Sequence, residues 1–171
     1  MKAFAIVAFC TLAAIVYGIV HDQVTARVCV EYFTIGHPKV VDSTSPTVLG
    51  LVWGVLATWW VGVILGSLWA LAARAGPRPK LEPGRFVKPV VIVMLVSGLA
   101  AFFVGLLGHE MAVNDIVVLK GRLAEAVPRE RQVAFVTCWW AHSASYLAGA
   151  LGGLFVAVAT WRRRGRLPQT R

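Results

Sequence analysis

The chain has 171 residues, of which 58% are hydrophobic and 15% are charged, and its formal net charge is +9. A soluble domain of this length needs more polar surface, so the composition excludes an ordinary soluble protein and favours a membrane protein. The positive charge does not predict nucleic-acid binding, because the basic residues lie in short connections and in a tail, with no folded basic domain to present them.

Four apolar segments are long enough to cross a bilayer as helices, since about 20 residues span the ~30 Å of hydrocarbon. We expect one helix from each, at about residues 3–20, 47–73, 86–108 and 133–161. The predicted fold class is an all-α integral membrane four-helix bundle, with residues 1–171 forming a single transmembrane domain.

The distribution of charge predicts the orientation of these helices. Lys2, residues 74–88 and residues 162–171 carry eleven Lys and Arg against one Glu, whereas residues 21–45 and 109–132 with their boundaries carry six basic and seven acidic residues. By the positive-inside rule, both termini, the linker at 74–85 and the basic tail at 162–171 are expected in the cytoplasm. Residues 21–45 and 109–132 are then two structured outer loops.

The first apolar segment could instead be a cleaved signal peptide, since Lys2 supplies a short positive region before it. Its length favours a retained helix, as do His21 and Asp22, which stand where a cleavage region is small and neutral. The run RVCVEYFTI in the first outer loop is typical of a short strand. It also places Arg27 and Glu31 at helical i, i+4 spacing, so both interpretations remain open.

Helix two is expected to begin at Ser45 and Pro46, a cap followed by proline in the first turn. Glycines then recur at helical spacing, which lets helix backbones approach closely in lipid. This pattern favours packing within the bundle, and a seam between copies of a homo-oligomer is the alternative. In the second outer loop, apolar residues at helical spacing predict an amphipathic helix on the outer face. These residues are Ile116, Leu119, Leu123 and Val127.

Histidines stand near the outer end of three of the four predicted helices. Counting about 20 residues at 1.5 Å per residue from each cytoplasmic boundary brings these histidines to one level. Acidic residues adjoin two of them, and imidazole with carboxylate suits a zinc, iron or copper ion. The candidate metal ligands are His21, His109 and His142, with Glu110 or Asp22 as a fourth ligand or orienting group, and Glu31 and His37 if the first loop folds back.

Other interpretations of these polar residues remain. They could form a polar cap of a non-catalytic scaffold or accessory subunit that docks a membrane partner, because interfacial His, Asp and Glu cost little. A haem or quinone redox protein is a further alternative. Cys29 and Cys138 fall on the outer side, where disulfides can form, and the sequence leaves open whether they are bridged. Neither a substrate nor catalysis follows from these residues.

The run HDQVTARVCVEYFTIGHP resembles a segment of small bacterial four-helix inner-membrane proteins. The resemblance covers that run and the four-helix layout, and it implies a bacterial inner (cytoplasmic) membrane and no activity. The chain lacks the loop cysteine pairs of four-helix thiol oxidases, the loop motifs of glutathione-using membrane enzymes and the paired mid-helix histidines of diheme cytochromes.

Overall fold

The structure is a computed structural model, and it describes residues 1–168. All regular elements among these residues are helical, with no strand. Four helical segments, Lys2–Val28, Pro46–Arg74, Pro83–Val113 and Arg129–Gly165, are long and apolar enough to cross a membrane. The prediction of an all-helical chain with four membrane-length helices is therefore confirmed. Residues 169–171 of the predicted basic tail lie outside the described residues.

Short elements interrupt or precede the long helices. The first spanning segment is α1 (Lys2–Val28), and α2 (Val30–Thr34) follows it. The second segment consists of α3 (Pro46–Leu56) and α4 (Trp59–Arg74). The third consists of the 3₁₀ turn η1 (Pro83–Phe86) and α5 (Val87–Val113). The last part contains α6 (Arg122–Ala126), the 3₁₀ turn η2 (Arg129–Arg131) and α7 (Gln132–Gly165).

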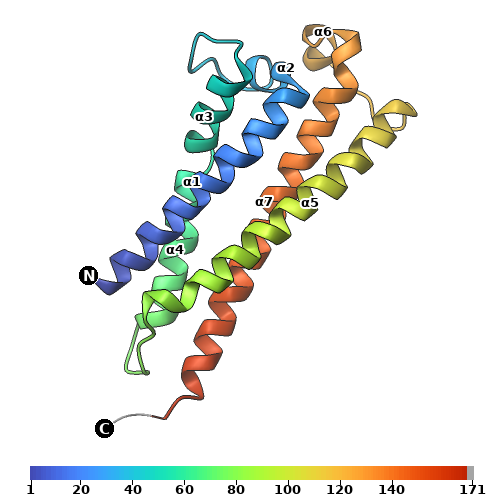
Figure 1. The fold of residues 1–171 in the computed structure, drawn as a ribbon. Coiled ribbons are helices and arrows are strands. Elements are labelled where there is room, and N and C mark those ends of the chain that lie inside the picture. The colour runs from blue at the N-terminus through green and yellow to red at the C-terminus, as the bar shows by residue number, and fades with distance from the viewer. Residues whose placement is uncertain (169–171) are drawn as a thin grey trace.

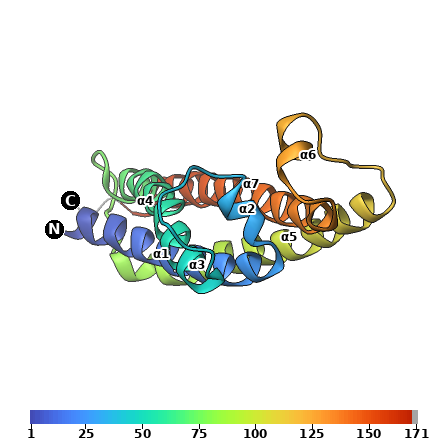
Figure 2. The same ribbon diagram turned by 90° about the horizontal axis from the view of Figure 1, so that it is seen from above.

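The long helices form two antiparallel pairs. Helix α1 packs along α3 and α4, and α5 packs along α7, while α4 and α7 connect the pairs (Figure 1). The start of α1, the end of α7 and the linker between α4 and η1 lie at one end of the bundle, and α2 and α6 lie at the other (Figure 1). Seen from above, α2 lies over the junction between the pairs, where it contacts α3 and α7 (Figure 2).

Glycines hold α3 and α4 against α1. A Cβ atom on Gly54 would lie 2.5 Å from the Cα atom of Ile19, and one on Gly62 would lie 2.5 Å from the Cα atom of Thr11. Because any larger side chain would meet the α1 backbone, the small residues at helical spacing in this segment serve packing inside the chain.

Several elements differ from their predicted bounds. Helix α1 continues past residue 20 to Val28, and the run that could have been a strand ends α1 and forms α2. The segment predicted as one helix at 47–73 is broken at Ala57 and Thr58. The hydroxyl of Thr58 donates a hydrogen bond to the carbonyl oxygen of Gly54, a local bond that competes with the helical one.

The amphipathic helix predicted for the second loop is reduced to the five residues of α6. A turn interrupts the apolar pattern, because Asp115 adopts a φ of 56° and Ile116 is exposed. Leu119 and Val127 are buried instead, and they join a core cluster with Cys29, Phe135 and Cys138. Two of the four apolar residues, Leu119 and Val127, are therefore buried, but no single helix spans all four.

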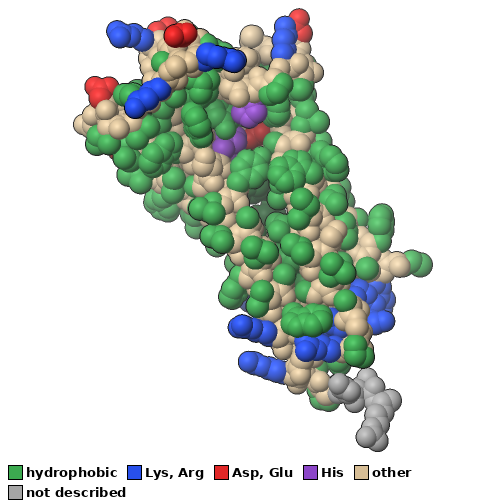
Figure 3. Space-filling view, turned by 180° about the vertical axis from the view of Figure 1, so that it is seen from behind, with side chains coloured by type: hydrophobic (Ala, Val, Ile, Leu, Met, Phe, Trp, Pro, Cys, Tyr) green, Lys and Arg blue, Asp and Glu red, His purple; other side chains and the backbone are tan. Residues whose placement is uncertain are grey.

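Lysine and arginine side chains gather at the end of the bundle that holds the start of α1 and the end of α7 (Figure 3). We call it the basic end, and it includes Lys2, Arg74, Arg78, Arg85, Arg162 and Arg164. Arg164 is fully buried. Its guanidinium donates hydrogen bonds to the carbonyl oxygens of Ala72, Ala75, Arg78 and Pro79. This one side chain therefore ties the end of α7 to the linker that follows α4.

Candidate metal centre

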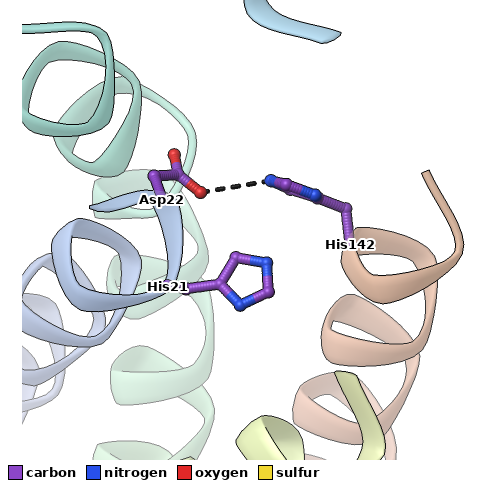
Figure 4. A group of neighbouring side chains, drawn as sticks. All are labelled: His21, Asp22 and His142. Atoms are coloured by element: carbon purple, nitrogen blue, oxygen red, sulfur yellow. Dashed lines mark hydrogen bonds and ion pairs between the residues drawn. The ribbon is translucent and has the colours of Figure 1, made fainter. Parts of the chain in front are cut away.

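Three of the predicted ligands lie together between α1 and α7. His21 and Asp22 are consecutive on α1, and His142 faces them from α7 (Figure 4). One ligand atom from each, an imidazole nitrogen or a carboxylate oxygen, lies within 4.8 Å of the other two. Asp22 is 4% exposed and His142 is 8% exposed, so the group is not a surface cluster. We call His21, Asp22 and His142 the His–Asp–His cluster.

Both ring nitrogens of His142 face oxygen atoms. Its Nδ1 lies 2.8 Å from the carbonyl oxygen of Cys138, and its Nε2 lies 3.1 Å from Oδ1 of Asp22. A neutral imidazole has one N–H, so it can donate to only one of these acceptors. Both contacts are satisfied when a cation or a second proton lies between Nε2 and Oδ1 of Asp22. With a bound cation, the bond from Nδ1 to the backbone carbonyl is the usual support of a metal-binding histidine.

His21 has a ring nitrogen without a partner. Its Nε2 is the only buried side-chain nitrogen or oxygen among the described residues that makes no hydrogen bond. The ring of His21 lies 4.5 Å from that of His142, edge to face, and points from α1 into the space between the helices (Figure 4). An unpaired buried polar atom costs free energy unless a ligand satisfies it.

Aromatic residues of the first loop close over the cluster. The ring of Tyr32 lies 4.5 Å from that of His142. His37 hydrogen-bonds through Nδ1 to the carbonyl oxygen of Tyr32 at 2.8 Å, and its ring packs 4.6 Å from that of Trp53 on α3. Burial lowers the pKa of His37, so this histidine is neutral at neutral pH. The first loop does fold back, but His37 contributes to a lid of aromatic rings outside the cluster.

The structure does not bring the other predicted ligands to the cluster. His109 is exposed on α5, and its Nδ1 lies 3.3 Å from the hydroxyl of Thr137. Glu110 is also exposed. His109 contacts α7 at Thr137, five residues from His142, and its side chain is exposed to solvent. A first shell that contains His109 and Glu110 is therefore not the arrangement in this structure.

Glu31 instead holds the first loop to α7. Its Oε2 forms an ion pair at 2.9 Å with Nε of Arg131. Burial acts to raise the pKa of Glu31, but the hydrogen bonds that it accepts outweigh this effect and hold the pKa below its usual value. The Sγ of Cys29 also lies 3.4 Å from this carboxylate. Glu31 is thus occupied as an ion-pair partner near the cluster and is not part of it.

The thiols of Cys29 and Cys138 are free and buried above the cluster, Cys138 one turn from His142 on α7 and Cys29 about two turns from Asp22 at the end of α1. The carbonyl oxygen of Thr25 accepts the backbone N–H of Cys29 at 2.9 Å and the thiol of Cys138 at 3.4 Å. This shared acceptor brings the end of α1 beside α7.

Further polar side chains near the cluster were not among the predicted site residues. The hydroxyl groups of Tyr17 and Ser145 lie 2.7 Å apart, which joins α1 to α7 below the cluster. Tyr146 donates a hydrogen bond at 3.1 Å to the carbonyl oxygen of Ala57, at the break between α3 and α4. A signal was present in the sequence, because Tyr17 precedes His21 by four residues and Ser145 follows His142 by three.

No family model, curated protein or solved structure matches the chain. The resemblance of its HDQVTARVCVEYFTIGHP run to small bacterial inner-membrane proteins stays a prediction. The observations that bear on function are the position and the geometry of the cluster. It combines two imidazoles and one carboxylate, largely buried, inside a bundle of membrane-length helices.

Proposed function

We propose that the chain is a membrane protein that binds one transition-metal ion between α1 and α7 at His21, Asp22 and His142. The observation that carries the proposal is the unpaired buried Nε2 of His21 beside a histidine whose two nitrogens both face oxygen atoms. A cation bound by all three residues gives His21 a partner, and it leaves Nδ1 of His142 free to donate to Cys138.

The spacing of the donor atoms supports a metal ion. Bonds of about 2.0–2.2 Å in a tetrahedral zinc site place neighbouring ligand atoms about 3.4 Å apart. Asp22 and His142 already lie 3.1 Å apart, and the whole group is within 4.8 Å. Small side-chain rotations of His21 therefore bring the third donor into the first shell.

The donor set limits the metal. Two imidazoles and one carboxylate are a common set for catalytic Zn²⁺, with a fourth position left open, and for non-haem Fe²⁺. Copper also accepts imidazole ligands, but no thiolate or thioether joins the cluster to favour Cu⁺. We therefore rank zinc and iron above copper, with at least one coordination position free for water or another ligand.

We further propose a bacterial inner membrane as the location, with both termini in the cytoplasm. The start of α1, the end of α7 and the arginine-rich linker share the basic end of the bundle, and lysine and arginine favour the cytoplasmic side. The cluster then lies toward the periplasmic side.

Metal content is the direct test. The full chain, purified in detergent and incubated with Zn²⁺ or Fe²⁺, is passed over a desalting column and analysed by inductively coupled plasma mass spectrometry. We expect about one ion per chain in the wild-type protein. The variants His21→Ala and His142→Ala are expected to lower the affinity on the order of 100-fold, since each removes one ligand of three.

His109→Ala is the matched control, because it removes a histidine of the same end that lies outside the cluster. This variant is expected to retain wild-type metal content. Wild-type protein that binds no stoichiometric ion would contradict the proposal and favour the alternative of a non-catalytic scaffold. Equal metal loss from His109→Ala and His142→Ala would also contradict the assigned ligands.

A further inference from the structure

A cavity begins at the His–Asp–His cluster and continues toward the basic end. It has a volume of about 110 Å³ and is lined by residues of α1, α4, α5 and α7. His21, Asp22 and His142 line one end, and Cys10, Trp69 and Val90 line the other. Figure 3 shows histidine and acidic side chains in a recess of the surface, with hydrophobic side chains below it. The cavity therefore joins the cluster to the interior of the bundle.

The lining is polar at the cluster and mostly apolar beyond it. Near the cluster, Tyr17 and Ser145 are hydrogen-bonded to each other, and the hydroxyl of Tyr146 is bonded to a backbone carbonyl. The other end is lined by small and aliphatic side chains, among them Ala13, Ala14, Gly62, Leu65, Val93 and Met94. A ligand in this cavity would find most partners for a polar group at the end where His21 Nε2 lies, with the hydroxyl groups of Thr58 and Ser97 as the further polar groups of the lining.

Small residues create this space. Gly149 on α7 lines the cavity, and a Cβ atom there would only reach van der Waals contact with Ser97. An apolar cavity of about 150 Å³ in another protein takes up benzene, so a volume of the present size admits several carbon atoms. The contents expected in its apolar part are hydrocarbon.

The charges of the lining restrict the polar end of such a ligand. The lining, all of it within residues 1–168, contains the carboxylate of Asp22 and no lysine or arginine. A phosphate or sulfate group would therefore find no cationic side chain, and Asp22 would repel it. An uncharged oxygen atom, such as that of an alcohol, aldehyde or ketone, can bind a metal ion at an open position without this penalty.

We propose that the cavity binds the hydrocarbon chain of an uncharged single-oxygen lipid, a long-chain alcohol or carbonyl compound, with its oxygen directed to the metal ion. This inference rests on the proposed metal site, which supplies the partner of the oxygen. The source is the bilayer itself, because the helical segments that line the cavity have membrane length. The chain would occupy the apolar part, and the oxygen would lie at His21 and His142.

Photolabelling tests this inference. Hexadecanol that carries a diazirine in its chain is added to the full protein in nanodiscs, irradiated, and located by peptide mass spectrometry. We expect labelled residues on α1, α4, α5 or α7 within the cavity lining, and we expect excess hexadecanol to reduce the labelling at least fivefold. Hexadecyl phosphate, whose head group is anionic, is expected to compete much less.

Filling the cavity provides the matched comparison. Gly149→Leu is expected to reduce cavity labelling at least fivefold, whereas Ala150→Leu, which adds the same side chain to an exposed position one residue away, is expected to have no effect. A second pair of variants applies the same comparison if Gly149→Leu fails to fold. Val61→Phe fills the cavity from α4, and Ile64→Phe changes an exposed residue of the same helix.

Metal content is measured in the same samples, so that failure of the metal site can be distinguished from failure of the lipid inference. One ion per chain, with labelling lost in the filled variants, supports both. One ion per chain, with labelling that hexadecanol does not displace or that both filled variants leave unchanged, overturns the lipid inference and leaves the metal site. Wild-type protein without stoichiometric metal overturns the metal site and this inference with it.

Discussion

His142 of α7 and Asp22 of α1 lie 3.1 Å apart across the junction of the two helix pairs, although they are 120 positions apart in the chain. The contact is buried, with 10% of the His142 side chain and 5% of the Asp22 side chain exposed. Few contacts join α1 to the α5–α7 pair directly, so this contact both fixes the candidate ligands and connects the halves of the bundle.

The coupling between Asp22 and His142 can be measured in metal-free protein. Removal of one partner from a buried hydrogen-bonded pair costs about 1–3 kcal/mol, because the other is left unpaired. We expect Asp22→Ala and His142→Ala each to lower the free energy of unfolding by about this amount. The double variant should lose about 2 kcal/mol less than the sum, measured by unfolding in mixed micelles.

The exposed ion pair of Lys39 and Asp42 is the control for this cycle, since it has the same kind of contact at 2.8 Å with side chains 71% and 92% exposed. It should show no measurable coupling. An additive result for Asp22 and His142 would mean that the two side chains do not interact in the folded protein.

The glycines between α4 and α1 predict a second effect on stability. Gly62→Ala places a Cβ atom 2.5 Å from the Cα atom of Thr11, and the backbone there cannot move without separating the helices. We expect a loss of about 1–3 kcal/mol in unfolding free energy, as for other overpacked contacts. Gly98→Ala is the control, because the nearest atom to its new Cβ lies 3.9 Å away. Equal stability of the two variants would contradict the close approach of α4 and α1.

Arg164 predicts a local effect at the basic end. Arg164→Met removes every hydrogen bond that this buried guanidinium donates to the carbonyl oxygens of Ala72, Ala75, Arg78 and Pro79. These oxygen atoms then lose that partner. We expect faster tryptic cleavage after Lys80, by about tenfold, since release of the linker raises the population of its open form. Arg163→Met, at an exposed neighbouring position, should cleave at the wild-type rate. A wild-type rate in Arg164→Met would show that the linker is held by other contacts.

The adjacent thiols predict a disulfide under oxidising conditions. Treatment with diamide should join Cys29 to Cys138, with a loss of two hydrogens in the intact mass and a free energy of unfolding raised by up to about 4 kcal/mol. Cys138→Ser should abolish this mass change, and Cys10→Ser should retain it, because Cys10 lies far below in α1. A mixed disulfide or no reaction in the wild-type protein would contradict the proximity of the two thiols.

The sequence predicted the main architecture because apolar length is a strong physical signal. The four membrane-length helices follow from runs of about 20 residues, and the level of His21 and His142 follows from the rise per residue. The break at Thr58 was missed because local hydrogen bonding, not hydropathy, ends the helix there. The two outer connections were predicted least well, since tertiary packing decides their conformation.

The rotation of a helix is hard to predict from its sequence. His109 faces Thr137 and solvent instead of His21. Apolar residues surround α5 on all sides, so its sequence has no polar stripe that indicates which face turns inward. On α1 and α7 the polar residues Tyr17, His21, His142 and Ser145 share helical spacing, and this spacing does mark the face that the structure buries.

The measurement that tests the metal site most directly is zinc K-edge X-ray absorption of the protein loaded with one Zn²⁺ per chain. We predict a first shell of nitrogen and oxygen atoms at about 2.0–2.2 Å, with the outer-shell scattering of two imidazoles. His142→Ala should remove one imidazole, and His109→Ala should remove none. A shell of oxygen atoms without imidazole scattering, or a sulfur shell at about 2.3 Å, would contradict binding by His21, Asp22 and His142.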